Sequence, residues 1–155
     1  MARFPVRVLF VGTDNASRSQ LAEALLEHEA GHLFRASSAG IAPRPVHRLT
    51  VQVLHEVGID WSAARSKGVE TVGAEPFDYV ITMCREARDG CPEFPGARFV
   101  VHWGLADPAA DEGTAVQRLA AFRRARREVA AAVHQFIEQT LRGPDQPRSH
   151  PAGTS

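Results

Sequence analysis

A short polar segment, residues 12–19 (GTDNASRS), holds the side chains best suited to anion chemistry. It follows an apolar run and precedes a segment with helical periodicity, so its backbone N–H groups should gather at a helix N-terminus, which attracts anions. The planar guanidinium of Arg18 can bind two oxygens of a tetrahedral oxyanion, and Ser19 adds a hydroxyl beside it. The segment lacks the patterns of a Walker A loop and of a dinucleotide loop. Taken alone, the same residues would also suit an ordinary capping loop.

Cys84 and Cys91 are the only two cysteines of the chain, and six residues separate them. In a reducing compartment such a pair is inert, metal-binding or redox-active rather than a structural framework. The intervening residues 85–90 (REARDG) are charged and include a glycine, so this segment could unwind and bring the sulfurs within disulfide distance. Zinc is disfavoured, because no second pair of cysteines or histidines supplies the remaining ligands.

Composition places these residues in an ordinary globular protein. The 155 residues are 44% hydrophobic and 23% charged, and 18 basic residues balance 18 acidic ones. With no net charge, the sequence favours neither nucleic acid nor a membrane as a partner, and we interpret the arginines at 118–127 as a solvated helix face. The first 11 residues do not resemble a signal peptide and no apolar run reaches membrane length. We therefore expect a cytoplasmic protein.

Hydrophobic periodicity predicts the elements that position the polar segment. We expect strands over 7–11, 34–38, 77–83 and 99–103, and helices that begin at Arg18, near Val46 and at Thr114, the last continuing to Leu141. This alternation predicts an α/β fold: a three-layer, doubly wound, four-stranded parallel sheet with a phosphate-binding loop after the first strand. Residues 1–142 should form one domain. Residues 143–155, rich in Pro, Gly and Ser, should be a disordered tail.

The loop and its flanks, residues 8–26 (VLFVGTDNASRSQLAEALL), resemble the phosphate loop of the low-molecular-weight tyrosine phosphatases and the thioredoxin-coupled arsenate reductases. Those proteins carry Cys, five residues, Arg and then Ser, and Gly12 stands at the cysteine position. The resemblance covers residues 5 to about 140, and it is closest to the arsenate reductase branch. The matching residues are Asn15, Arg18, Ser19, Ala22, Glu23, 38–40, 58–60, Cys84, Cys91, His102, Trp103, Asp107 and Pro108.

The resemblance implies a role for each matched position. The loop thiolate, lost at Gly12, would attack arsenate; Cys84 would attack the adduct; Cys91 would resolve the disulfide for thioredoxin to reduce. Asp107 would be the general acid, although an Asp-Pro pair alone is usually just a turn. Asn15, Glu23 and Ser38 match positions that bind potassium in some arsenate reductases. The anion itself (arsenate, phosphate or sulfate) would lie against Thr13, Asp14, Asn15, Ala16, Ser17, Arg18 and Ser19.

Three functional hypotheses remain open at this stage. The first is an arsenate reductase-like protein, related to arsenic resistance, that kept the oxyanion loop and the redox pair but lost covalent catalysis at Gly12. The second is a working arsenate reductase or tyrosine phosphatase that carries a Cys-to-Gly change at position 12. The third is a non-catalytic interaction module. Thr13 and Ser17 offer hydroxyls but no neighbouring base to activate them, so we do not expect either to replace the thiol.

Overall fold

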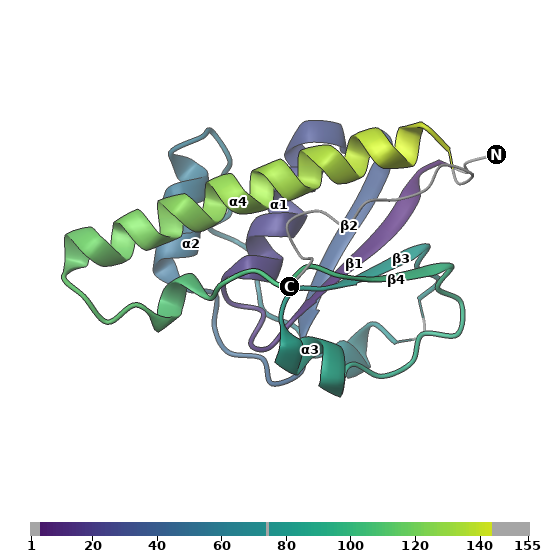
Figure 1. Ribbon diagram of the computed structural model, residues 1–155, viewed down its shortest axis with the longest axis horizontal. Coiled ribbons are helices and arrows are strands. Elements are labelled where there is room, and N and C mark those ends of the chain that lie inside the picture. The colour runs from purple at the N-terminus through teal and green to yellow at the C-terminus, as the bar shows by residue number, and fades with distance from the viewer. Residues whose placement is uncertain (1–3, 74, 144–155) are drawn as a thin grey trace.

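A computed structural model describes residues 4–73 and 75–143 of the chain (Figure 1). Strands and helices alternate along it, as the sequence predicts. The strands are β1 (Val6–Gly12), β2 (Phe34–Gly40), β3 (Tyr79–Thr82) and β4 (Phe99–His102). The helices are α1 (Arg18–Ala30), α2 (Arg48–His55), α3 (Arg85–Gly90) and α4 (Ala115–Leu141), with short 3-10 helices at Val69–Thr71 and Pro108–Ala110.

The four strands form one parallel sheet in the order β2-β1-β3-β4. β1 is central because its residues are buried on both faces; only Arg7 in it is partly exposed. The chain passes from β1 to β2 on one side and then crosses to β3 on the other. The strand order therefore reverses beside β1, and the carboxyl ends of β1 and β3 flank the point where ligands bind in such sheets.

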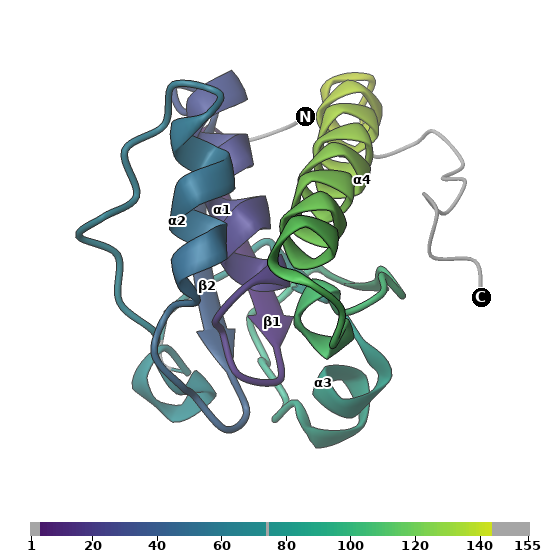
Figure 2. The same ribbon diagram turned by 90° about the vertical axis from the view of Figure 1, so that its left-hand side faces the viewer.

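Helices cover both faces of this sheet, which gives the expected three layers. Figures 1 and 2 show α1, α2 and α4 on one face and α3 on the other. The larger core lies under α1, α2 and α4, where Trp103 packs between Phe10 and Phe136 with ring centroids 5.6 and 6.2 Å away. A smaller core beneath α3 includes Cys84 and Ala87. α3 contributes only one buried residue, so it is held less firmly than the long helices.

The predicted strands and helices are all present, but helix α3 was not among them, and the other differences lie at the ends of elements. β2 continues to Gly40, two residues beyond the expected end, because Gly40 pairs with Gly12. β3 is shorter than expected and begins only at Tyr79. α2 begins at Arg48 and ends at His55, before Val57, which is exposed. Hydrogen bonds and packing between distant segments fix these ends, and local periodicity does not report them.

The long C-terminal helix begins where the sequence predicts. The Thr114 side chain accepts a hydrogen bond from the backbone N–H of Gln117, and Gln117 bonds back, so a capping box begins α4. Its inner face buries Phe122, Val129, Val133 and Phe136, and Leu119 is partly buried. Among the described residues no helix is long and apolar enough to cross a membrane. The predicted tail falls almost entirely on residues 144–155, outside the described part of the chain.

Candidate functional site

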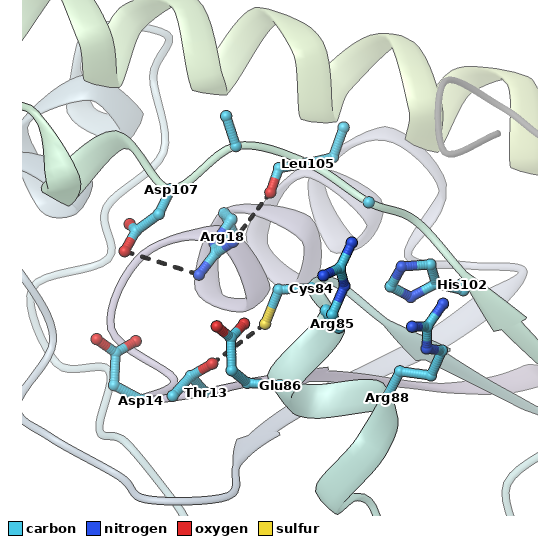
Figure 3. A pocket seen from close by; sticks show the side chains of 12 residues that line it. Thr13, Asp14, Arg18, Cys84, Arg85, Glu86, Arg88, His102, Leu105 and Asp107 are labelled. Carbon is cyan, nitrogen blue, oxygen red and sulfur yellow. Dashed lines mark hydrogen bonds and ion pairs between the residues drawn. The ribbon is translucent and has the colours of Figure 1, made fainter. Parts of the chain in front are cut away.

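Three loops meet at the carboxyl edge of the sheet and enclose a cavity of about 700 Å³ (Figure 3). The loop after β1 contributes Thr13, Asp14 and the helix residue Arg18. The segment after β3 contributes Cys84 and the first turns of α3, and the segment after β4 contributes residues 104–107. Parallel strands bring all three loops to one edge, so residues far apart in sequence face a common space.

Every carbonyl group of residues 12–17 accepts a hydrogen bond from outside the loop. The segment that follows β2 supplies four of the eight donors, and α1, α2 and Ser66 supply the rest. With the carbonyl oxygens turned outward, the N–H groups between them turn toward the inside of the loop, the arrangement of an anion-binding nest. The donors are Ile41 N to Gly12, Ala42 N to Thr13, Arg44 N to Asp14, Gln20 Nε2 and Ser66 Oγ to Asn15, His47 N and Thr50 Oγ1 to Ala16, and Leu21 N to Ser17.

Several of those N–H groups have no acceptor within the described residues, namely those of Asp14, Asn15, Ser17 and Arg18. The N-terminus of α1 also lacks a side-chain cap, because Ser17 makes no capping hydrogen bond. One donor is already engaged: the Asp14 carboxylate accepts a hydrogen bond from Ala16 N at 3.2 Å. The loop thus presents free donors at the positive end of a helix dipole, with one carboxylate beside them.

Asn15 holds the loop in shape from within. It is fully buried and has a positive φ of 55°, a conformation that asparagine tolerates better than most residues. Its Nδ2 donates to Ser19 Oγ and to Ser38 Oγ, both at 2.9 Å, and its Oδ1 accepts from Lys67 N at 2.9 Å. Gly40 lets the loop approach, since a Cβ there would lie 2.9 Å from Asn15 N. These bonds preorganise the loop before any ligand binds.

The expected potassium positions lie together but bond to one another instead of presenting oxygens to a cation. The Ser38 hydroxyl donates to Glu23 Oε1 at 2.6 Å while accepting from Asn15 Nδ2. Because the backbone N–H of Lys67 can only donate, the side-chain Oδ1 of Asn15 faces Lys67 and its Nδ2 faces Ser38. Burial raises the pKa of Glu23, which disfavours its charged form. In this arrangement the three residues do not fit a cation.

Arg18 extends from α1 across the cavity floor. Its Nη1 donates to the carbonyl oxygen of Leu105 at 2.9 Å, and its Nη2 lies 3.8 Å from Asp107 Oδ2. The side chain is only 10% exposed, so few rotamers are open to it. The segment after β4 therefore holds the guanidinium inside the cavity, between Leu105 and Asp107.

Asp107 begins the 3-10 helix Pro108–Ala110, where its Oδ1 accepts from Ala109 N at 3.0 Å. Its side chain remains 38% exposed and faces Arg18. The carboxylate thus serves a turn, as its sequence suggests, and also lines the cavity. The structure brings it to the same site as the loop, across a long stretch of sequence.

Gly12 is the last residue of β1 and has ordinary strand geometry, so its backbone would accept any L-amino acid. A Cβ there would lie 3.0 Å from Ser19 Oγ and 3.4 Å from Ser19 Cβ, with no other heavy atom closer than 3.9 Å. The first contact is tight, but a hydroxyl can rotate away by a few tenths of an ångström. A Cβ at position 12 is therefore accommodated once Ser19 Oγ, which accepts a hydrogen bond from Asn15 Nδ2, shifts slightly.

The two cysteines flank α3 and face different spaces. Cys84 lies just before α3, is buried, and places its Sγ 3.1 Å from Thr13 Oγ1 in the main cavity. Cys91 follows α3, is half-buried, and lines a separate pocket of about 320 Å³. Burial raises the pKa of the Cys91 thiol, which keeps it protonated. Both thiols are free in this conformation.

Sequence reasoning gave no role to Arg85, Glu86 and Arg88 of α3 or to residues 104–106, and it named His102 only as a match to the family pattern. His102 lies in the cavity wall at the end of β4. Its Nδ1 lies 2.8 Å from Thr82 Oγ1, and its ring faces the cavity. Arg85 and Arg88 lie between the two cysteines and are three residues apart, a spacing that puts them on one face of a helix. This spacing could have indicated from the sequence that they share one wall of the site.

Comparison with known proteins agrees with this architecture. The model of the family described as low molecular weight phosphotyrosine protein phosphatase matches residues 7–145. An arsenate reductase of Halalkalibacterium halodurans is 37% identical over 131 residues, which cover 84% of this chain and 94% of the relative. An arsenate reductase of Bacillus subtilis is 34% identical with the same coverage of both chains.

Solved structures also resemble the chain over most of its length. A structure titled an arsenate reductase in the phosphate binding state superposes with a TM-score of 0.75 at 30% identity, covering 86% of this chain and 98% of that one. Another, titled an arsenate reductase in oxidized state, gives a TM-score of 0.74. With the fold, the loop geometry and nearly the whole length in common, the chain belongs to the low molecular weight phosphotyrosine protein phosphatase family and is similar to its arsenate reductases.

Proposed function

We propose that this chain binds a tetrahedral oxyanion in the loop of residues 12–18 and no longer catalyses through a covalent bond to that loop. The single observation that carries the first part is the outward orientation of all six loop carbonyls, which leaves N–H donors facing inward at an uncapped helix N-terminus. Arg18 supplies the charged contact, once its guanidinium turns from Leu105 toward the anion. The relatives' names and the phosphate-bound structure support arsenate or phosphate as the anion.

Loss of covalent catalysis follows from position 12. By resemblance, the family nucleophile stands where this chain has Gly12, and a glycine has no atom to attack with. The hydroxyl of Thr13 contacts only the Cys84 thiol within the described residues, so it has no base to activate it. Asp107, at the position of the general acid, then has no covalent intermediate to serve. Its contact with Arg18 becomes its main interaction in the cavity.

Cys84 and Cys91 are proposed as a redox pair that a thioredoxin could reduce. Six helical residues separate them, and a rise of about 1.5 Å per residue puts their α-carbons about 10.5 Å apart, beyond disulfide range. α3 must therefore unwind for the sulfurs to meet. With Ala87 as its only buried residue, α3 has little packing to lose. Oxidation would then change the wall of the anion cavity, since Cys84 lines it.

Calorimetric titration with arsenate, phosphate and sulfate tests the proposal. We expect saturable one-to-one binding in the millimolar range, about −4 kcal/mol, because Asp14 opposes an anion that the loop otherwise favours. Arg18→Ala should abolish it, whereas Arg35→Ala, on the exposed face of β2, should not. Binding that survives Arg18→Ala unchanged would place the anion elsewhere.

The fit of a side chain at position 12 favours one second candidate, a genuine reductase or phosphatase with a Cys-to-Gly change. The Cβ of Gly12→Cys needs only a small movement of Ser19 Oγ. Sequencing the codon for residue 12 in independent isolates separates a native Gly12 from a recent Cys-to-Gly change, since a recent change would leave cysteine codons in most isolates. Anion binding that depends on Arg18 would count against the third possibility, a pure interaction module.

A further inference from the structure

The cavity is larger than a tetrahedral anion requires. At about 700 Å³ it falls within the range of sites for small organic molecules. The loop occupies one end of it, and the wall formed by α3 and β4 extends well beyond (Figure 3). A ligand that fills the cavity would carry a substantial organic part next to its anionic group.

The charges of this cavity are unevenly distributed. At the loop end, the carboxylates of Asp14, Glu86 and Asp107 gather near the single cation Arg18. These carboxylates weaken the binding of a bare dianion there, because like charges at short range repel even in a partly solvated site. The loop end alone is therefore a poor site for a small, highly charged ligand.

The opposite end is basic and is not neutralised. Arg85 makes no ion pair among the described residues, and Arg88 pairs only with its exposed neighbour Asp89, at 3.4 Å. His102 lies beside them, and burial and then the charge of Arg88 lower its pKa. Figure 3 shows these three side chains together across the cavity from Asp107. The charges of Arg88 and Arg85 both act on His102 at this wall, and only Asp89 opposes them, so an anionic group here would offset positive charge.

We propose that Arg85, Arg88 and His102 form a second anion subsite, and that the cavity takes a small organic phosphate that carries a further anionic group such as a carboxylate. This assignment rests on the proposed function, since the phosphate of that ligand occupies the loop. The phosphate binds the N–H groups and Arg18, the organic part crosses the cavity near Cys84, and the second anion meets the two arginines. The basic wall supplies the attraction that the loop end lacks.

The test compares 3-phosphoglycerate with glycerol 3-phosphate, which has nearly the same size but no carboxylate. We expect 3-phosphoglycerate to bind on the order of tenfold more tightly, since two exposed charge contacts are each worth somewhat less than 1 kcal/mol. Replacing both Arg85 and Arg88 with alanine should remove this advantage and leave glycerol 3-phosphate binding unchanged. The matched control replaces the exposed α4 arginines Arg124 and Arg127 with alanine and should keep the advantage.

A second readout follows His102 by NMR. An anion at the subsite favours the imidazolium, so 3-phosphoglycerate should raise the pKa of His102 and glycerol 3-phosphate should not. Equal affinities for the two probes together with an unmoved His102 would overturn the subsite. If neither probe binds, or if Arg18→Ala leaves the affinity of both probes unchanged, then the proposed oxyanion function itself is wrong, and not only the second subsite.

Discussion

Replacing Asp14 with asparagine should strengthen oxyanion binding at the loop. The carboxylate lines the cavity beside Arg18, and its Oδ1 accepts a hydrogen bond from Ala16 N at 3.2 Å. Asparagine can accept that same bond through its own Oδ1, so Asp14→Asn removes the charge and keeps the local turn. The substitution therefore isolates electrostatics from loop geometry.

The magnitude follows from Coulomb's law. A unit charge about 5 Å from a bound anion costs roughly 3 kcal/mol at an effective dielectric constant of 20. Asp14 is half-exposed, so solvent screening reduces this to about 1 kcal/mol, or about a fivefold gain in affinity. Because the effect is electrostatic, the gain should shrink at high salt.

Isothermal titration with sulfate, at low and at high salt, measures this gain. Sulfate is suitable because its charge stays fixed near neutral pH. Glu138→Gln removes an exposed charge near the far end of α4 and should leave the affinity unchanged. Equal or weaker binding by a folded Asp14→Asn protein would refute the reasoning, since it would mean that the carboxylate does not face the anion.

Three further predictions concern position 12, the cysteine pair and the α2–α4 contact. Gly12→Cys should give measurable turnover of arsenate or an aryl phosphate, whereas the unmodified protein and Gly12→Ala should give none. A folded Gly12→Cys protein without any turnover would show that the rest of the site is not catalytic. Mild oxidation should link Cys84 to Cys91, detected by thiol counting and mass spectrometry, and two free thiols after treatment would return the pair to an inert role. Glu56→Gln should cost about 1 kcal/mol of unfolding free energy at pH 7, because it breaks ion pairs with two arginines of α4. Those pairs hold the pKa of Glu56 at about 2, below its usual 4.5. The loss of unfolding free energy in Glu56→Gln should therefore shrink as the pH drops from about 4.5 toward 2. An equal loss at both ends of this pH range would contradict the role of the ion pairs.

The fold and the loop were predictable because their signals are local. The buried run before Gly12 predicts a central strand, and the periodicity after Arg18 predicts a helix, so the loop between them had to lie at the carboxyl edge of the sheet. The capping box at Thr114 is equally local. Each of these features depends on residues within a few positions of one another.

The rest of the site could not be predicted, because it depends on how distant segments pack. Asn15 reaches Ser38 because β1 pairs with β2, and it reaches Lys67 because the segment of Lys67 bonds to Gly40 at the end of β2. The role of Leu105 as the acceptor for Arg18 follows from where the chain runs after β4. The position of His102 in the cavity wall requires β4 to lie beside β3, which no spacing in the sequence reveals.

The central claim is that the N–H groups of residues 14–18 form an oxyanion site. Backbone amide NMR during a phosphate titration tests it most directly, because it observes those groups one by one. The structure predicts saturable shifts of the Asp14, Asn15, Ser17 and Arg18 amides, with a common affinity, and their loss in Arg18→Ala. Saturable chemical-shift changes confined to another surface, or unchanged chemical shifts of the loop amides at saturating phosphate, would contradict the claim.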